Sequence, residues 1–496
     1  MIKKPLFLLL LLFTLTRLPN LTLLPIYADE ANYLDWGWRS IQKPDHLFYS
    51  LYDAKQPLLI WIFGISEILF TDPLFAGRIV SVIAGLTCLL GIFFTTRRLF
   101  DPKSAFIASV LYILVPIFLF FDRQALMETS IASVGIWSYY FLDRFLEKPG
   151  LKKSFCLFLT LAIGVWIKNS ALLFFVPFSI IILLYLKKFP QQIYSIFNYL
   201  LFGFILFLLT LSPLFFQADF WKTFSLNSRY TLGLSELFKF PISVWLKNLL
   251  GILDISFFFL TPLIFLSAVW GIIKFKTSHF YLILWLLIPL IQIILTTRTL
   301  NFRYPAAFLI PYVIFTAAVI PKKVYSYLLI TCIPVIVSFI QITNPPKYFE
   351  LLSRFSAYSY INDYITGDLS GYLVNAIVSY INQLDNTTPI TVSFALNSGN
   401  FEAALIDYFH KNPRISTTYF DSRLFSEKLN DFDCFYYSGS QLYFFAREQQ
   451  RGGMDRFLIK KDLITPLHGR DYSTVYTLRN DCPPEKTISI FLTATY

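Results

Sequence analysis

Long apolar segments alternate with short polar turns along the first two thirds of the chain. Most approach the ~20 residues that a helix needs to cross a bilayer. The pattern predicts eleven membrane-spanning helices. The expected spans are 5–24, 75–96, 104–121, 126–143, 154–167, 170–186, 196–216, 248–273, 279–297, 302–320 and 324–341. Residues 154–186 fit either two spans or one interrupted helix, and 57–70 fit a helix partly inserted at the interface.

The pattern changes after residue 341, where polar positions become frequent. Residues 388–394, 433–437 and 442–446 fit strands, while 371–384 and 401–411 fit helices. This predicts a soluble α/β domain over 342–496, after a transmembrane domain over 1–341 whose first outer loop is 25–74. The tail has no glycine-rich nucleotide motif and no nucleophile elbow.

Composition agrees with a mainly α-helical membrane protein. Hydrophobic residues make up 56% of the chain and charged residues only 15%. The net charge is +11, but the basic residues fall mainly in short loops between apolar segments. We therefore expect no nucleic-acid partner.

The basic loops also predict the orientation in the membrane. With Lys3 and Lys4 in the cytoplasm, every second loop is cytoplasmic and carries lysine or arginine, as the positive-inside rule requires. An odd number of spans then places the tail outside the cytoplasmic membrane. There Cys434 and Cys482 would be able to form a disulfide, or stay apart.

This orientation brings many ionisable groups to the outer face. They are Asp29, Glu30, Asp35, Lys55, Asp122, Arg123, Glu128, Lys168, Arg298 and Arg303. Charges at membrane depth are costly, and they mark either a structural ion-pair network or a functional site. For Asp29 we favour function.

A mixed acidic and basic site beside the outer leaflet suits a lipid-linked phosphosugar. Lys55, Lys168 and Arg303 are candidates to hold its phosphate. A carboxylate would take the proton from an acceptor hydroxyl or amine. The leaving phosphate needs charge stabilisation more than protonation, so one base and a cationic cradle suffice. A divalent metal held by acidic residues is a further option, and a metal-free site is another.

Several motifs resemble those of the GT-C glycosyltransferases. The similar branch contains the dolichyl-phosphate-mannose protein mannosyltransferases and the lipid A aminoarabinose transferases. The motifs are Asp29-Glu30 after the first span, Lys55-Gln56-Pro57-Leu58, the stretch from Arg123 to Thr129, Gly164 to Lys168, and Arg303-Tyr304-Pro305. The resemblance covers about residues 1–340. It departs from the family pattern at Gln56, which replaces a proline, and at Glu128, which replaces an aspartate.

The resemblance implies roles for these residues. Asp29 would be the catalytic base, and Glu30 would support it or a metal. Lys55 would contact the donor phosphate. Glu128 would stand at the second acidic position, with Asp122 as a substitute if a metal binds there.

The leading hypothesis is therefore a membrane glycosyltransferase. It would move a hexose or pentose from a polyprenyl-phosphate-linked donor to a protein, lipid or glycan acceptor, by inverting displacement. The alternatives are a transporter or lipid flippase, which usually shows related halves, and a scaffold with a receptor-like tail.

Overall fold

The architecture is described from a computed structural model. It describes residues 3–277, 279–321, 323–367, 369–384, 388–395, 400–420, 434–436, 441–446, 458–465, 468, 473–478 and 487–489. The chain forms two compact units. We call residues 1–21, 43–63 and 77–359 the helical unit, and residues 22–42, 64–76 and 360–496 the mixed unit.

Helices make up nearly all of the described part of residues 1–359. The α-helices are α1 (Lys3–Arg17), α2 (Ala28–Gln42), α3 (Pro57–Leu69), α4 (Pro73–Leu99), α5 (Pro102–Leu114), α6 (Pro116–Asp122), α7 (Glu128–Glu147), α8 (Leu151–Ile167), α9 (Phe175–Lys188), α10 (Ile193–Phe215), α11 (Ala218–Leu226), α12 (Leu234–Leu237), α13 (Ile242–Leu260), α14 (Pro262–Lys274), α15 (Phe280–Thr296), α16 (Arg303–Ala306), α17 (Ile310–Val319), α18 (Val324–Thr343) and α19 (Pro345–Ser353). Short 3₁₀ turns are η1 (Pro44–His46), η2 (Tyr49–Asp53), η3 (Asn169–Phe174), η4 (Pro190–Gln192) and η5 (Asn227–Arg229).

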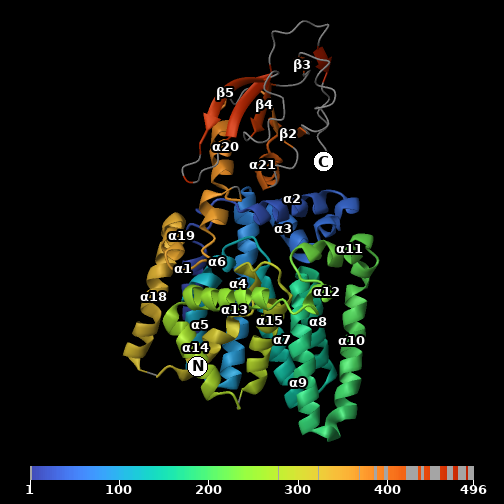
Figure 1. The fold of residues 1–496 in the computed structure, drawn as a ribbon, viewed down its shortest axis with the longest axis vertical. Helices are drawn as coiled ribbons and strands as arrows, with labels where there is room; N and C mark the ends of the chain where they lie inside the picture. Colours follow the sequence, from blue (N-terminus) through green and yellow to red (C-terminus); the bar gives the residue numbers. More distant parts are fainter. Residues whose placement is uncertain are drawn as a thin grey trace. The chain divides into compact units, whose positions relative to one another are not determined.

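Within the helical unit, α8 packs against α7 and α10 (Figure 1). α14 and α5 both pack against α17. Among the described residues, five helices are long and apolar enough to cross a membrane, or six if the bent pair α5–α6 is one span. α3, α14, α15 and α17 are shorter apolar helices. The protein is thus mainly helical and multi-pass.

Three predicted spans are broken in the described structure, and one of them is 302–320, which forms α16 and α17 with a turn between them. Residues 104–121 form α5 and α6, bent by 67°, because Pro116 has no backbone N–H and its ring excludes the preceding turn. Residues 248–273 form α13 and α14. They meet at Thr261, which has a φ of 76°, and Pro262 then begins α14.

In the mixed unit, α2 and α3 approach each other at two glycines. A Cβ atom added at Gly64 would lie 2.1 Å from the carbonyl oxygen of Gly37. No side chain fits in that space, so glycine is required for the approach.

We expect Gly64→Ala to destabilise the protein by about 1–3 kcal/mol, because the backbones must separate to admit the methyl group. Thermal unfolding in detergent would measure this. The control is Gly150→Ala, where a Cβ atom meets nothing within 4 Å. Equal stability of the two variants would contradict the close approach.

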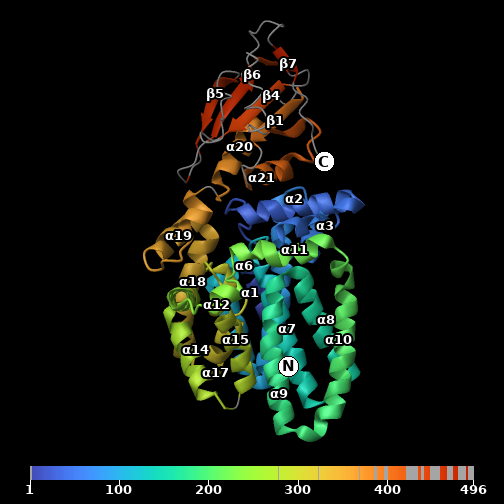
Figure 2. The same cartoon turned by 45° about the vertical axis from the view of Figure 1, so that its right-hand side comes forward.

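The described residues beyond position 360 form the π-helical turn η6 (Asn362–Thr366), helices α20 (Tyr372–Gln383) and α21 (Asn400–Phe409), and seven strands. Figure 2 shows this part of the chain. The strands are β1 (Ile390–Ala395), β2 (Ile415–Phe420), β3 (Cys434–Tyr436), β4 (Gln441–Ala446), β5 (Leu458–Ile464), β6 (Ser473–Leu478) and β7 (Thr487–Ser489). Among these, α20, α21, β1, β3 and β4 coincide with the elements expected from the sequence.

The main sheet has the order β2-β1-β4-β6-β5. β1 is parallel to β2 and β4, whereas β6 is antiparallel to β4 and β5. β3 and β7 form a separate parallel pair. The segment β1–α21–β2 is a crossover between neighbouring parallel strands. Within this crossover, α21 is held in place by its own buried side chains, including Leu405 and Ile406.

Candidate functional site

Glu128 is the centre of a buried charged cluster in the helical unit. It is the first residue of α7 and only 2% exposed. Its Oε1 accepts hydrogen bonds from Lys168 Nζ at 2.7 Å and Arg303 Nε at 3.1 Å. The positive end of the α7 dipole also stabilises a carboxylate there. The two predicted phosphate-binding cations therefore meet on one predicted acidic residue.

Local breaks in the helices bring the two cations to this point. Lys168 ends α8 with an extended backbone, at φ −162° and ψ 136°. Arg303 begins the single turn α16, just before Pro305. Lys55 is close enough to repel Lys168 electrostatically. All three predicted donor-binding cations thus belong to one charged neighbourhood.

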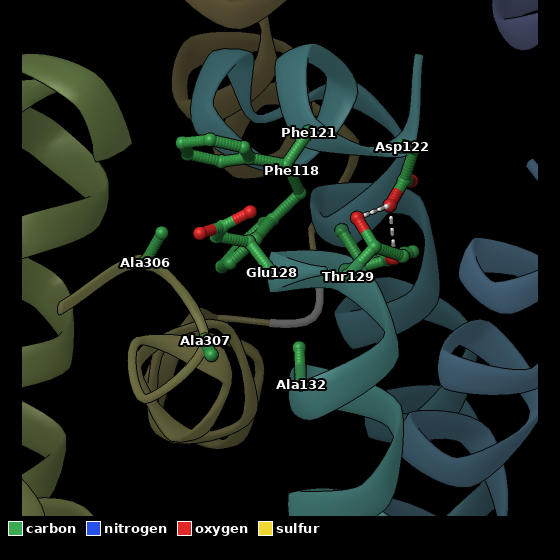
Figure 3. A pocket seen from close by; sticks show the side chains of 9 residues that line it. Phe118, Phe121, Asp122, Glu128, Thr129, Ala132, Ala306 and Ala307 are labelled. Atoms are coloured by element: carbon green, nitrogen blue, oxygen red, sulfur yellow. Dashed lines mark hydrogen bonds between the residues drawn. The ribbon is translucent and has the colours of Figure 1, made fainter. Parts of the chain in front are cut away.

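A small pocket opens beside Glu128 (Figure 3). Its other lining residues are Tyr112, Phe118, Phe121, Asp122, Thr129, Ala132, Ala306 and Ala307. Within the described part of the chain, Glu128 Oε2 has no hydrogen-bond partner. The site thus combines a small cavity, a carboxylate oxygen without a partner and adjacent cations.

Asp122 lines the same pocket, but its carboxylate is occupied. Oδ2 accepts from Arg17 Nε at 3.1 Å and Nη2 at 2.9 Å, while Oδ1 accepts from Tyr112 at 2.8 Å and Thr129 at 3.0 Å. Arg17 is fully buried. The pair joins α1 to the end of α6, which is a structural role. Arg17 was not predicted, although an arginine within an apolar segment is itself a signal.

Arg123 also forms hydrogen bonds at the C-terminal end of α1. Its guanidinium donates to the carbonyl oxygens of Thr16, Arg17 and Asn20 at 2.7–3.1 Å. The last carbonyls of a helix have no partner within it, and a cation there satisfies them. The stretch from Arg123 to Glu128 therefore combines a helix cap with the carboxylate beside the pocket.

Lys55 follows Ala54, which has a left-handed φ of 62°, and only Gln56 separates it from the start of α3 at Pro57. Its Nζ lies 3.7 Å from Asp53 Oδ2, and Asp53 Oδ1 also accepts from Arg229 Nη2 at 2.6 Å. Lys55 is 22% exposed in its side chain. It is therefore anchored loosely and can reach a ligand.

Asp29 and Glu30 lie in the first turn of α2, in the mixed unit. Glu30 is fully buried, and its Oε2 accepts from the backbone N–H of Tyr27 at 2.9 Å. This is half of a capping box, in which the third helical residue bonds back to the cap. Asp29 is half-buried. Glu30 thus holds the helix start that presents Asp29, and the predicted catalytic roles of both stay predictions.

The predicted disulfide falls partly outside the described residues. Cys434 begins β3, but Cys482 lies in an undescribed segment, so the pairing stays a prediction.

Comparison with known proteins supports the resemblance inferred from the motifs. Residues 54–216 match the family described as dolichyl-phosphate-mannose-protein mannosyltransferase. No curated protein sequence matches the chain.

Solved structures show the same fold at low sequence identity. ArnT from Cupriavidus metallidurans bound to undecaprenyl phosphate has a TM-score of 0.60 and 12% identity, over 96% of this chain and 98% of that one. The apo state of the same ArnT has a TM-score of 0.57 and 12% identity, and the match covers 95% of this chain and 96% of that one. The Archaeoglobus fulgidus oligosaccharyltransferase in complex with Zn and sulfate has a TM-score of 0.52 and 13% identity. This match covers 91% of this chain and 68% of that one.

The predicted resemblance is confirmed by the family match and by the fold together. The family match also confirms, at the level of the family, the prediction of a glycosyltransferase of the polyprenyl-phosphate-sugar class. Over residues 54–216 the chain carries the sequence pattern of the dolichyl-phosphate-mannose-protein mannosyltransferases, and over nearly its whole length it has the fold of ArnT.

Proposed function

We propose that this protein transfers a sugar from a polyprenyl-phosphate-linked donor to an acceptor on the outer face of the cytoplasmic membrane. The observation that carries the proposal is the pairing of buried Glu128 with Lys168 and Arg303 beside a pocket. The ArnT of similar fold was crystallised with undecaprenyl phosphate, a donor-side product of this kind. The acceptor is a protein, a lipid or a cell-surface glycan.

The cations would bind the donor phosphate. Arg303 offers a planar fork of N–H donors, while Lys168 and Lys55 act as point charges. Glu128 holds two of these cations in place before the donor arrives, and such preorganised charge is effective in stabilising a leaving phosphate. The phosphate would share the cations with Glu128 Oε1.

Asp29 would be the general base. Its carboxylate takes the proton of the acceptor hydroxyl or amine while the acceptor oxygen or nitrogen attacks the anomeric carbon. The bond between that carbon and the phosphate oxygen breaks, and polyprenyl phosphate leaves with the electron pair. Attack opposite the leaving group inverts the anomeric configuration, as in inverting glycosidases.

A divalent metal was predicted as an option at Glu30 or Glu128. At Glu128, two side-chain cations within about 3 Å already supply positive charge, and a third cation would be repelled. At Glu30, one carboxylate oxygen is committed to the helix cap. These residues fit a metal poorly, and no step of the proposed reaction uses one.

We also propose the membrane topology that the sequence predicts. It has eleven spans, a cytoplasmic N-terminus, a catalytic domain over 1–341 and an extracytoplasmic domain over 342–496. The basic cytoplasmic loops support it. A cysteine introduced near residue 411 should then react with a membrane-impermeant reagent added to intact cells.

The direct test is reconstitution of the purified protein in liposomes with polyprenyl-phosphate sugars and membrane extract. We expect acceptor glycosylation together with release of polyprenyl phosphate. Solute or lipid transport without donor consumption would instead support the transporter alternative.

Lys55→Ala should weaken donor binding without removing the base. Loss of one charge-assisted hydrogen bond of about 1.5–3 kcal/mol corresponds to a roughly 10- to 150-fold rise in the donor KM. Initial rates at varied donor concentration would measure it, with Lys239→Ala as a control at an exposed lysine. An unchanged donor KM would remove Lys55 from the phosphate site.

A further inference from the structure

A second cluster of ionisable side chains lies wholly within the mixed unit and plays no part in the proposed transfer. Glu67 is near the end of α3, Asp407 is on α21, and His410 directly follows α21. One carboxylate oxygen from each acid and a ring nitrogen of His410 all lie within 4.8 Å of one another. His410 Nε2 is 3.8 Å from Glu67 Oε2.

These side chains are buried, and most of their polar atoms have no side-chain hydrogen-bond partner within the described residues. Glu67 is 0% and Asp407 2% exposed, and the side chain of His410 is 2% exposed. Both oxygens of Glu67, both of Asp407 and Nε2 of His410 have no partner there. Buried polar groups are nearly always satisfied, and leaving five such atoms without partners is costly. The cluster therefore calls for a ligand.

Burial also disfavours the charged forms of these groups. Desolvation, together with the charges of Glu67 and Asp35, raises the pKa of Asp407 well above its usual range. Desolvation and the nearby Lys411 lower the pKa of His410 to about 4.

The neighbouring cations are committed elsewhere. Arg39 donates through Nε to both carboxylate oxygens of Asp35, at 2.8 and 2.9 Å. Lys411 Nζ donates to the backbone carbonyls of Glu67 and Phe70 at the end of α3, and it lies 5.5 Å from the centroid of the Trp38 ring. Arg39 is close enough to favour the charged form of Asp407, and Lys411 that of Glu67.

His410 is oriented as a metal ligand is. Its Nδ1 lies 3.3 Å from the carbonyl oxygen of Ile406, so Nδ1–H can donate there and Nε2 presents its lone pair to the cluster. Metal-binding histidines almost always make such a second bond. The Trp38 ring packs against the imidazole, with centroids 4.1 Å apart.

We propose that Glu67, Asp407 and His410 bind one divalent transition-metal ion, of which Zn²⁺ is the best fit. One imidazole with two carboxylates suits Zn²⁺ better than Ca²⁺ or Mg²⁺. Ligand distances of about 2.1 Å around a tetrahedral ion place ligand atoms roughly 3.4 Å apart, so these atoms, which lie within 4.8 Å of one another, would move closer together when an ion binds. Because the site is buried, its role is structural. It fastens α21 to the end of α3 within the mixed unit.

The test uses the full chain without an affinity tag, purified in detergent and dialysed against a chelator. Titration with ZnCl₂, followed by elemental analysis, should recover about one zinc per chain. The midpoint of thermal unfolding should rise with zinc concentration, because a ligand that binds the folded state stabilises it. X-ray absorption at the zinc edge should show nitrogen and oxygen ligands without sulfur.

Two variants and a control locate the ion. His410→Ala and Asp407→Asn should each lose the bound zinc and the zinc-dependent rise in midpoint, whereas His46→Ala, which removes a histidine from η1, should keep both. If the wild-type chain binds no zinc and Asp407→Asn raises its midpoint, the carboxylates instead share protons and the proposal is overturned. Zinc retained by both variants would equally overturn it. Sugar transfer plays no part in these readouts, so they are independent of the proposed function.

Discussion

Asp29→Asn should reduce sugar transfer by about 100- to 10,000-fold, the range over which a positioned general base contributes. Asparagine has nearly the same shape but cannot accept the proton of the acceptor. The first turn of α2 is retained, because Glu30 rather than Asp29 bonds to the backbone N–H of Tyr27. Product formation and released polyprenyl phosphate in liposomes would measure the loss.

A measurement of donor binding distinguishes the loss of the catalytic base from the loss of the folded structure. Asp29→Asn should bind the donor with wild-type affinity and unfold at the wild-type temperature. Asp45→Asn is the matched control, since Asp45 is an exposed carboxylate on the turn η1. Transfer by Asp29→Asn at the rate of this control would show that another group takes the proton.

Glu128→Ala should produce the second large effect, on both stability and transfer. Removing one partner from a buried ion pair typically costs about 3–5 kcal/mol, because the remaining charge stays buried and unpaired. Here Arg303 is the cation most affected, since its side chain is only 9% exposed, against 27% for Lys168. The midpoint of thermal unfolding and the donor KM would report the two losses.

The surface ion pair of Glu236 with Arg298 provides the comparison. Both carboxylate oxygens of Glu236 accept from Arg298, at 2.8 and 2.9 Å, but both side chains are more than a third exposed. Glu236→Ala should leave the midpoint nearly unchanged. If donor phosphate restores the stability of Glu128→Ala, then phosphate and Glu128 use the same cations. No such rescue would place the phosphate elsewhere.

The sequence predicted those helices correctly whose bounds are set by the length of an apolar segment alone. The expected spans 154–167 and 324–341 correspond to α8 and α18 within a few residues at either end. The expected span 248–273 missed the break at Thr261. Pro262 was visible, but a proline is also tolerated inside α10, α15 and α18. Neighbouring helices decide between the two outcomes.

The site was predicted as a set of residues but not as a set of contacts. Lys168 and Arg303 were assigned to the face of Glu128 through topology, yet Arg303 lies 175 positions from Glu128 in the chain. Nothing in local periodicity links positions so far apart. The bond of Glu30 to Tyr27, by contrast, spans three residues and could have been predicted from spacing. Glu67, Asp407 and His410 were missed because three separate residues carry no motif.

The buried pair of Arg17 and Asp122 restricts how relatives of this protein can diverge. A Cβ atom added at Gly85 would lie 2.7 Å from the Asp122 carboxyl carbon, so a larger residue at position 85 and a longer acid at position 122 are both excluded. Loss of either charge would leave the other one buried without its ion-pair partner. Positions 17, 85 and 122 should therefore change together or not at all.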